Sequence, residues 1–404
     1  MPETSIYKNI IAPLIPLLKK EIGHLPKDDY TLSLYFFTMN LCYAIISGIS
    51  SIRLLITESK TSNEAKKLGI IIASSSMYSE AFSRYDPNIF KRIFLRLIGQ
   101  LEFKEIPEIC SLGRFILMDG SIFPAIKTMD WASYKKKSNA IKMHLSFELN
   151  RMIPVQFVST DAKTSERKVL KSILEKGVTY IADRGYVSFN LFSQIANQSA
   201  FFIIRVKSNM GYNSSNSLAF DLPEDWSEYF DNVTDKIVIF TGDEQQNTYR
   251  LIMFSVHGET YQIATNRFDL KTYEIIMLYA YRWQIELFFR CIKRCFNGLH
   301  LWTHDSKGIE IQFYLYMIVY ILLLHFKQEI QTDENNFETN QLTPKKDNNH
   351  LNDSSLRTPN CGIVTLLGER LKSLWKIGIH WLKAVKNMLS LPLNLERIKI
   401  LNSV

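Results

Sequence analysis

The run FILM (115–118) ends directly on Asp119, and the run VTYIA (178–182) ends directly on Asp183. Strand-like and helical patterns alternate around these two runs, in the order KMHLSFEL (142–149), PVQFV (154–158), helix 164–176, VTYIA, helix 187–197 and FFIIRV (201–206). This mixed order of strands and helices predicts an α/β fold in which helices pack on a sheet.

Strand-like sequence continues beyond residue 208. An irregular, polar region is followed by three further apolar runs, KIVIFTG (236–242), YRLIMFS (249–255) and TYQIAT (260–265). We therefore interpret 208–262 as a β-rich insertion between the last sheet strand and a long helix over 271–296.

The two ends of the chain differ from this middle part. Residues 1–104 have helical spacing, and Asp86-Pro87 predicts the start of a helix over 87–103. A helix-turn-helix that binds DNA and ordinary helical packing both fit this N-terminal domain. Residues 328–360 are polar and predict a flexible linker, and 361–404 return to a helical pattern that predicts a C-terminal tail.

The composition allows a polyanionic partner. The 404 residues carry a net charge of +8, which fits a nucleic-acid partner or a protein that is simply basic. Five scattered cysteines favour reduced thiols over a disulfide framework. No signal peptide is visible, and the apolar runs 34–49 and 313–326 are shorter than the roughly 20 residues that cross a bilayer. We therefore expect a cytoplasmic protein that is associated with the bacterial nucleoid and has no membrane partner.

Asp119 and Asp183 are candidate metal ligands. Carboxylates at strand ends are held on rigid elements, where metal ligands work well. Hard cations such as Mg²⁺ take oxygen ligands, and two such ions can activate an attacking oxygen and stabilise a leaving one. Either aspartate alone also fits a turn residue that ends a strand.

The predicted helix 271–296 carries four polar residues in an apolar surrounding, namely Tyr279, Arg282, Glu286 and Lys293. At about 100° per residue, the other three lie within about 40° of Glu286 around the helix axis. One reading is an exposed face with an Arg282–Glu286 pair. The apolar neighbours favour the other, a buried helix whose carboxylate holds metal while the cations and phenol hold a phosphate backbone.

The spacing Tyr279-x2-Arg282-x3-Glu286-x6-Lys293 resembles the signature of bacterial insertion-sequence transposases of the IS-four family. Flanking segments resemble blocks of that family in the same order: MDGS (118–121), AIKMHLSFEL (140–149), STDAKTSERKVL (159–170), IADRGY (181–186), FFIIRVKSN (201–209), ATNRFDL (264–270) and GLHLWTHDSKGIEIQFYLYMIVYILL (298–323). The similarity covers about 112–326, is looser in the N-terminal region and is slight in 328–404.

The resemblance implies an RNase H-like catalytic domain over 112–326, with Asp119, Asp183 and Glu286 as a DDE triad. It implies that these carboxylates bind two Mg²⁺ ions, which Mn²⁺ can replace. In that family, water nicks the transposon end, the freed 3′-hydroxyl often forms a hairpin, and the same hydroxyl later joins target DNA. The implied partners are the terminal inverted repeats, the target DNA and a second copy of the chain in a synaptic complex.

The same resemblance assigns phosphate contacts to Tyr279, Arg282 and Lys293. Several other residues are weaker candidates for DNA contact, namely Arg184, Arg205, Lys207, the lysines at 135–137 and Trp226, which is the tryptophan of the insertion. His144 fits a core position better than a metal site. Two alternatives stay open: an inert transposase-derived DNA-binding protein, and an RNase H-like metal nuclease without strand transfer.

Overall fold

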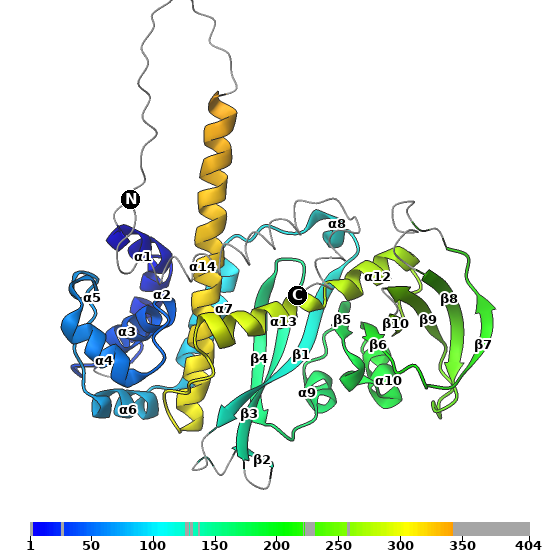
Figure 1. The fold of residues 1–404 in the computed structure, drawn as a ribbon, viewed down its shortest axis with the longest axis horizontal. Coiled ribbons are helices and arrows are strands. Elements are labelled where there is room, and N and C mark those ends of the chain that lie inside the picture. Colours follow the sequence, from blue (N-terminus) through cyan, green and yellow to red (C-terminus); the bar gives the residue numbers. More distant parts are fainter. Residues whose placement is uncertain are drawn as a thin grey trace, which may run out of the picture. The chain divides into compact units, whose positions relative to one another are not determined.

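The computed structural model describes residues 3–25, 28–125, 129, 132–135, 138–220, 222, 231–256 and 259–341 (Figure 1). These residues form two compact units, which are described separately. Of the described residues, one unit contains those from Glu105 to Arg294, and the other contains those up to Lys104 together with those from Cys295 to Gln341.

The unit 105–294 is built on one mixed sheet of ten strands. The strands are β1 (Arg114–Ala125), β2 (Ser133–Lys135), β3 (Ser138–Glu148), β4 (Ile153–Asp161), β5 (Val178–Ala182), β6 (Phe201–Arg205), β7 (Tyr212–Ser217), β8 (Asp231–Phe240), β9 (Tyr249–Val256) and β10 (Glu259–Thr265). Their order is β2-β3-β1-β5-β6-β10-β9-β8-β7, and β4 pairs with β3. The pairs β1–β5 and β5–β6 are parallel and the others antiparallel, which confirms the predicted α/β fold.

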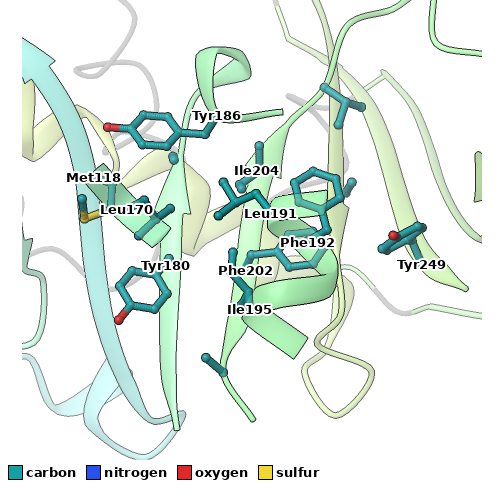
Figure 2. Packing of buried hydrophobic residues seen from close by; sticks show 14 of the residues in the cluster. Met118, Leu170, Tyr180, Tyr186, Leu191, Phe192, Ile195, Phe202, Ile204 and Tyr249 are labelled. Atoms are coloured by element: carbon teal, nitrogen blue, oxygen red, sulfur yellow. The ribbon is translucent and has the colours of Figure 1, made fainter. Parts of the chain in front are cut away.

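Helices cover both faces of this sheet. On one face α9 (Glu166–Ser172) and α10 (Phe189–Asn197) enclose an aromatic and aliphatic core, in which Phe192 stacks on Phe202 at 4.2 Å between ring centroids (Figure 2). The other face is covered by α12 (Thr272–Ala280) and α13 (Trp283–Arg290), where Phe288 packs on Phe147 of β3. A short helix, α8 (Pro107–Cys110), precedes β1. Burial on both faces explains the unbroken apolar run of β5.

The region predicted as an inserted β-rich segment extends this same sheet. β10 pairs with β6 in antiparallel fashion, with Ala264 opposite Ile204, and β9, β8 and β7 follow outward. The strand content was predicted from apolar runs. The attachment was not, because nothing in those runs indicates which sheet edge a strand will pair with.

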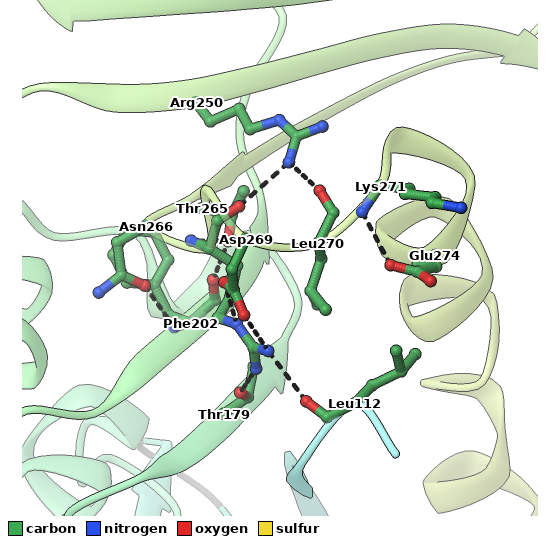
Figure 3. Close-up of polar contacts among 11 residues, drawn as sticks. Leu112, Thr179, Phe202, Arg250, Thr265, Asn266, Asp269, Leu270, Lys271 and Glu274 are labelled. Atoms are coloured by element: carbon green, nitrogen blue, oxygen red, sulfur yellow. Dashed lines mark hydrogen bonds and ion pairs between the residues drawn. The ribbon is translucent and has the colours of Figure 1, made fainter. Parts of the chain in front are cut away.

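Buried arginines fix the end of the added strands beside the neighbouring elements (Figure 3). Arg250 forms an ion pair with Asp235 at 2.5 Å and donates to the carbonyl oxygens of Arg267 and Leu270. Arg267 donates to Thr179 of β5 (2.6 Å) and to the Leu112 carbonyl oxygen (2.9 Å). These bonds tie the segment leading into α12 to β5 and to the start of β1.

The other unit is helical, as predicted for residues 1–104. Its helices are α1 (Glu3–Ile11), α2 (Leu14–Ile22), α3 (Leu34–Ile46), α4 (Ile52–Thr61), α5 (Asn63–Lys67), α6 (Ser75–Arg84), α7 (Pro87–Gln100) and α14 (Ser306–Gln341). The buried helix α3 packs against α6, α14 and α2. The predicted cap of α7 is confirmed, because the Asp86 carboxylate accepts from the Asn88 amide at 2.9 Å, with Pro87 in the first turn.

Helix α14 corrects two expectations. The apolar run 313–326 was judged too short to cross a membrane, but it belongs to a stretch, Ser306–Ile330, that is long and apolar enough by length and composition. Because 83% of the most apolar window of that stretch is buried inside the structure, a core helix accounts for it. The linker predicted from residue 328 is wrong for 328–341, because α14 continues to Gln341. Extending an existing helix needs no new nucleus, so a polar stretch can follow a buried one. Residues 342–404 and Trp226 lie outside the described residues.

Candidate active site

Asp119 and Asp183 follow paired positions of two parallel strands. β1 and β5 run parallel, with Met118 opposite Ala182, and each aspartate is the next residue along the chain. Asp183 lies just beyond the end of β5, as predicted, but Asp119 lies within β1, because that strand stays paired with β3 as far as Ala125. Backbone amides hold both side chains. Asp119 Oδ1 accepts from the Gly120 amide at 2.8 Å, and Asp183 Oδ1 accepts from the Gly185 amide at 2.8 Å. Asp183 thereby caps the short 3₁₀ turn η2 (Arg184–Tyr186).

The helix that carries Glu286 is not continuous, contrary to the prediction of one helix over 271–296. α12 ends at Ala280 and α13 begins at Trp283. The turn between them is tightened, since the Arg282 amide donates to the Tyr279 carbonyl oxygen, three residues back. The sequence contains no glycine or proline at this point, so nothing in it indicated the break.

A π-helical turn, η3 (Cys291–Cys295), follows α13 directly and carries Lys293. A π turn has one more residue per hydrogen-bonded turn than an α-helix and is frequent at functional sites. The ideal 100° spacing from which a shared face was predicted therefore does not hold over the whole segment.

The four polar residues of this segment, Tyr279, Arg282, Glu286 and Lys293, nevertheless contribute to a common site. Arg282 forms an ion pair with Glu286 at 2.6 Å, and its guanidinium carbon lies 5.9 Å from the centre of the Tyr279 ring. Lys293 Nζ lies 5.1 Å from the centre of the Phe123 ring of β1. The predicted alternative of an Arg282–Glu286 pair is thus realised in this half-buried setting.

The Asp119 carboxyl interacts with the charges of Arg282, Asp183 and Glu286. Burial raises its pKa from 3.8 to about 7; the Gly120 amide and Arg282 oppose this rise, whereas Asp183 and Glu286 add to it. Two carboxylates on different elements therefore repel a third across a shared space. From the sequence, these three residues were assigned to one site only by motif and by their order along the chain. The effect of Asp183 and Glu286 on the pKa of Asp119 supports that assignment.

The basic and phenolic groups around Asp119 respond to it. Burial lowers the pKa of Lys293, and the nearby Asp119 partly offsets that effect. Desolvation lowers the pKa of Arg282, but Tyr279, Glu286 and Asp119 outweigh it, so this pKa is raised. Arg282 and Lys293 are therefore cations beside a cluster of carboxylates, as a site for a phosphate with bound metal requires.

An aromatic and cationic pair lies beside Tyr279. The Arg205 guanidinium carbon stands 4.2 Å from the centre of the Tyr261 ring, and Arg205 and Asp183 both act electrostatically on the Tyr279 phenol. Tyr261 also stacks on Phe254, with 5.3 Å between ring centroids. Sequence reasoning named Arg205 but missed Tyr261, because only the pairing of β10 with β6 brings the two together.

The other predicted DNA contacts are less tightly placed. Arg184 follows Asp183 on η2 and is exposed, and Lys207 is exposed just after β6. Lys135 ends β2, and residues 136 and 137 lie outside the described residues. His144 is buried in β3 with Nε2 at 2.9 Å from Thr160, as expected for a core histidine.

The chemical types of these donors fit a divalent cation. Carboxylate oxygens are the ligands that hard cations take, and a bound cation would oppose the rise in the pKa of Asp119 that burial causes and that Asp183 and Glu286 increase. Within the described ranges, however, no three His, Cys, Asp or Glu side chains stand close enough together to hold a metal ion. The Glu286 carboxylate is instead paired with Arg282 at 2.6 Å.

Comparison with known proteins agrees with this geometry. Residues 111–322, about half of the chain, match the family model described as a transposase DDE domain. A Sinorhizobium fredii protein named as a transposase, y4zB, is 30% identical over 61% of this chain and 69% of its own length. A transposase named for insertion sequence element IS5377 of Geobacillus stearothermophilus is 23% identical over 48% of this chain and 52% of its own length.

A third relative, named as a transposase for insertion sequence element IS4SA of Synechocystis, is 22% identical and covers more of the chain, 76%, and 86% of its own length. The family match spans Asp119, Asp183 and the helix that carries Glu286. The chain therefore belongs to the DDE transposases of bacterial insertion sequences.

Proposed function

We propose that this transposase cuts the ends of its element and joins them to target DNA by divalent-metal-dependent phosphoryl transfer, in a cut-and-paste reaction with a hairpin intermediate. The observation that carries the proposal is the parallel pairing of β1 with β5, which puts Asp119 and Asp183 directly after paired residues, with Glu286 of α13 close enough to raise the pKa of Asp119. The resemblance to the IS-four signature supports an RNase H-like architecture for the sheet that holds them.

Asp119, Asp183 and Glu286 would hold two Mg²⁺ ions, or Mn²⁺ in their place. When bound, such ions supply an activated water or 3′-hydroxyl and stabilise the leaving oxygen of the phosphodiester. Asp119 must lose its proton to act as a ligand, and the positive charge of Arg282 favours that loss. Glu286 becomes available when Arg282 transfers its hydrogen bonds to a DNA phosphate.

Cationic and aromatic side chains near these carboxylates would position the DNA. Tyr279, Arg282 and Lys293 are in place to contact phosphates near the cleaved bond, because each interacts electrostatically with Asp119 or its neighbours. The exposed Arg184 and Lys207 would contact the backbone further away. Phosphate contacts fix register without reading sequence, so recognition of terminal repeats is assigned to the helical N-terminal residues.

Two element ends must be paired before they are joined, so the working complex contains a homodimer. The DNA partners are the terminal inverted repeats and the target.

The test is incubation of the full chain with DNA that carries the repeats flanking its gene, with Mg²⁺ or with EDTA, followed by denaturing electrophoresis. Nicked, hairpin and joined products should form in the reaction with Mg²⁺ and not in the reaction with EDTA. Asp119→Ala, Asp183→Ala and Glu286→Ala should each lower cleavage at least a thousandfold while DNA binding in a gel-shift assay persists. Nicking without joined product would indicate a nuclease, and binding without cleavage would indicate an inert DNA-binding protein.

A further inference from the structure

An ion pair lies close to the backbone that follows both aspartates, on the sheet face that α9 covers. Lys142 of β3 and Glu166, the first residue of α9, meet at 2.8 Å between Nζ and Oε1. Side chains alternate along β1, so Asp119 points to the face of α13 whereas Gly120 faces this ion pair. The pair is therefore on the opposite face of the sheet from Asp119, although it adjoins the same part of β1.

One carboxylate group adjoins the residues that follow both aspartates. A Cβ atom added at Gly120 of β1 would lie 2.8 Å from Glu166 Oε1, and one added at Gly185 of η2 would lie 2.9 Å from Glu166 Oε2. Neither position has room for a side chain while Glu166 stays in place. Glu166 thus fits between the β1 backbone next to Asp119 and the turn after Asp183.

The two contacted residues are also the ones that hold the aspartates. The Gly120 amide donates to Asp119 and the Gly185 amide donates to Asp183, each at 2.8 Å. A shift of Glu166 would therefore move both donors. Substitution of groups that orient metal ligands in this indirect way typically lowers metal affinity by about 10–100-fold.

The ion pair itself is mostly buried, with side-chain exposures of 14% for Lys142 and 21% for Glu166. The buried Tyr186 hydroxyl lies close enough to Glu166, Asp119 and Asp183 to interact electrostatically with all three. Burying two charges costs solvation that their attraction only partly returns, so such a pair adds little net stability. A role in fixing geometry accounts better for its place here.

We propose that Glu166, held by Lys142, is a positioning residue that sets the separation of the Asp119 and Asp183 carboxylates and thereby the affinity for the divalent cation. This inference rests on the proposed function of that site. Glu166 acts through the Gly120 and Gly185 backbone and is not itself a metal ligand or a catalytic residue.

The test measures binding of Mn²⁺ to the full chain by electron paramagnetic resonance, together with thermal unfolding in EDTA and DNA binding. Glu166→Ala should weaken Mn²⁺ binding about tenfold or more. Lys142→Met should weaken it as well, and the double variant should lose no more than Glu166→Ala alone, because the two residues act as one unit. DNA binding should stay at the wild-type level.

The matched control is Arg151→Ala, which removes the comparable Arg151–Glu148 pair at the other end of β3, with exposures of 26% and 6%. It should leave Mn²⁺ binding unchanged. If Glu166→Ala does not fold, Gly120→Ala provides the second variant, since its methyl group would displace the Glu166 carboxylate and should weaken Mn²⁺ binding to a similar extent.

Wild-type affinity for Mn²⁺ in a folded Glu166→Ala, or in Gly120→Ala, overturns the positioning role. An equal loss in Arg151→Ala overturns it too, because the effect would then be a general loss of stability. If the wild type binds Mn²⁺ and cuts DNA, and Glu166→Ala binds Mn²⁺ and cuts DNA equally well, only this inference is contradicted. If the wild type neither binds Mn²⁺ nor cuts DNA, the proposed function is contradicted, and this role with it.

Discussion

At the scale of single residues, Asp119 combines two opposed demands. Burial within β1 raises its pKa to about 7, whereas a metal ligand must be in the ionised form. The sequence identified this residue from an apolar run that ends on an aspartate. The shift could not be predicted from that run, because it depends on burial and on Asp183 and Glu286, which come from other elements.

This shift predicts how the stability of the metal-free protein depends on pH. The folded-state pKa is about 7 and the reference value is 3.8, so the folded protein holds the proton more tightly. The stabilisation is complete below the reference value and is lost as pH rises through about 7. Relative to Asp119→Asn, the wild type should therefore lose stability between about pH 4 and pH 7 and show no further change above that, measured by urea unfolding in EDTA. A stability difference that does not vary over this range would contradict the assignment.

At the scale of elements, the carboxylates depend on segments that are far apart in sequence. Helix α12 begins at Thr272, whose hydroxyl donates to Asp235 of β8 at 2.7 Å, and Arg250 of β9 joins the same group. The added strands therefore help to fix α12, which leads directly into α13, the helix that carries Glu286. Strand-like runs and helical spacing predicted most of these elements, but the break at residues 281–282 and the π turn follow from local hydrogen bonding that ideal periodicity does not include.

Removing this buried connection should be costly. Asp235→Ala leaves the Arg250 guanidinium buried without its carboxylate, which should reduce the free energy of unfolding by about 3–5 kcal/mol. The control, Glu175→Gln, weakens the more exposed pair with Arg114 and should cost about 1 kcal/mol or less. Both are measured by urea unfolding. Equal costs for the two variants would show that the Asp235–Arg250 pair does not anchor α12.

At the scale of the whole molecule, the sequence predicted the order of the three carboxylates along the chain. It did not predict which segments group into the same compact unit. Residues 112–326 were predicted as one catalytic domain, but the chain from Cys295 onward, including α14, groups with the N-terminal helices. The apolar residues 313–326 fit any buried helix, and their actual partners, such as α7 and α3, lie more than 200 residues earlier. Composition reveals that a helix is buried but does not identify what covers it.

The central claim is that Asp119, Asp183 and Glu286 form one metal site. Loading the full chain with Fe²⁺ in place of Mg²⁺ and adding peroxide and ascorbate generates radicals that cut the nearby backbone. The account predicts fragments that end near residues 119, 183 and 286 together, all lost in Asp119→Asn and suppressed by excess Mg²⁺. Cuts near only one of these positions, or only elsewhere in the chain, would contradict it.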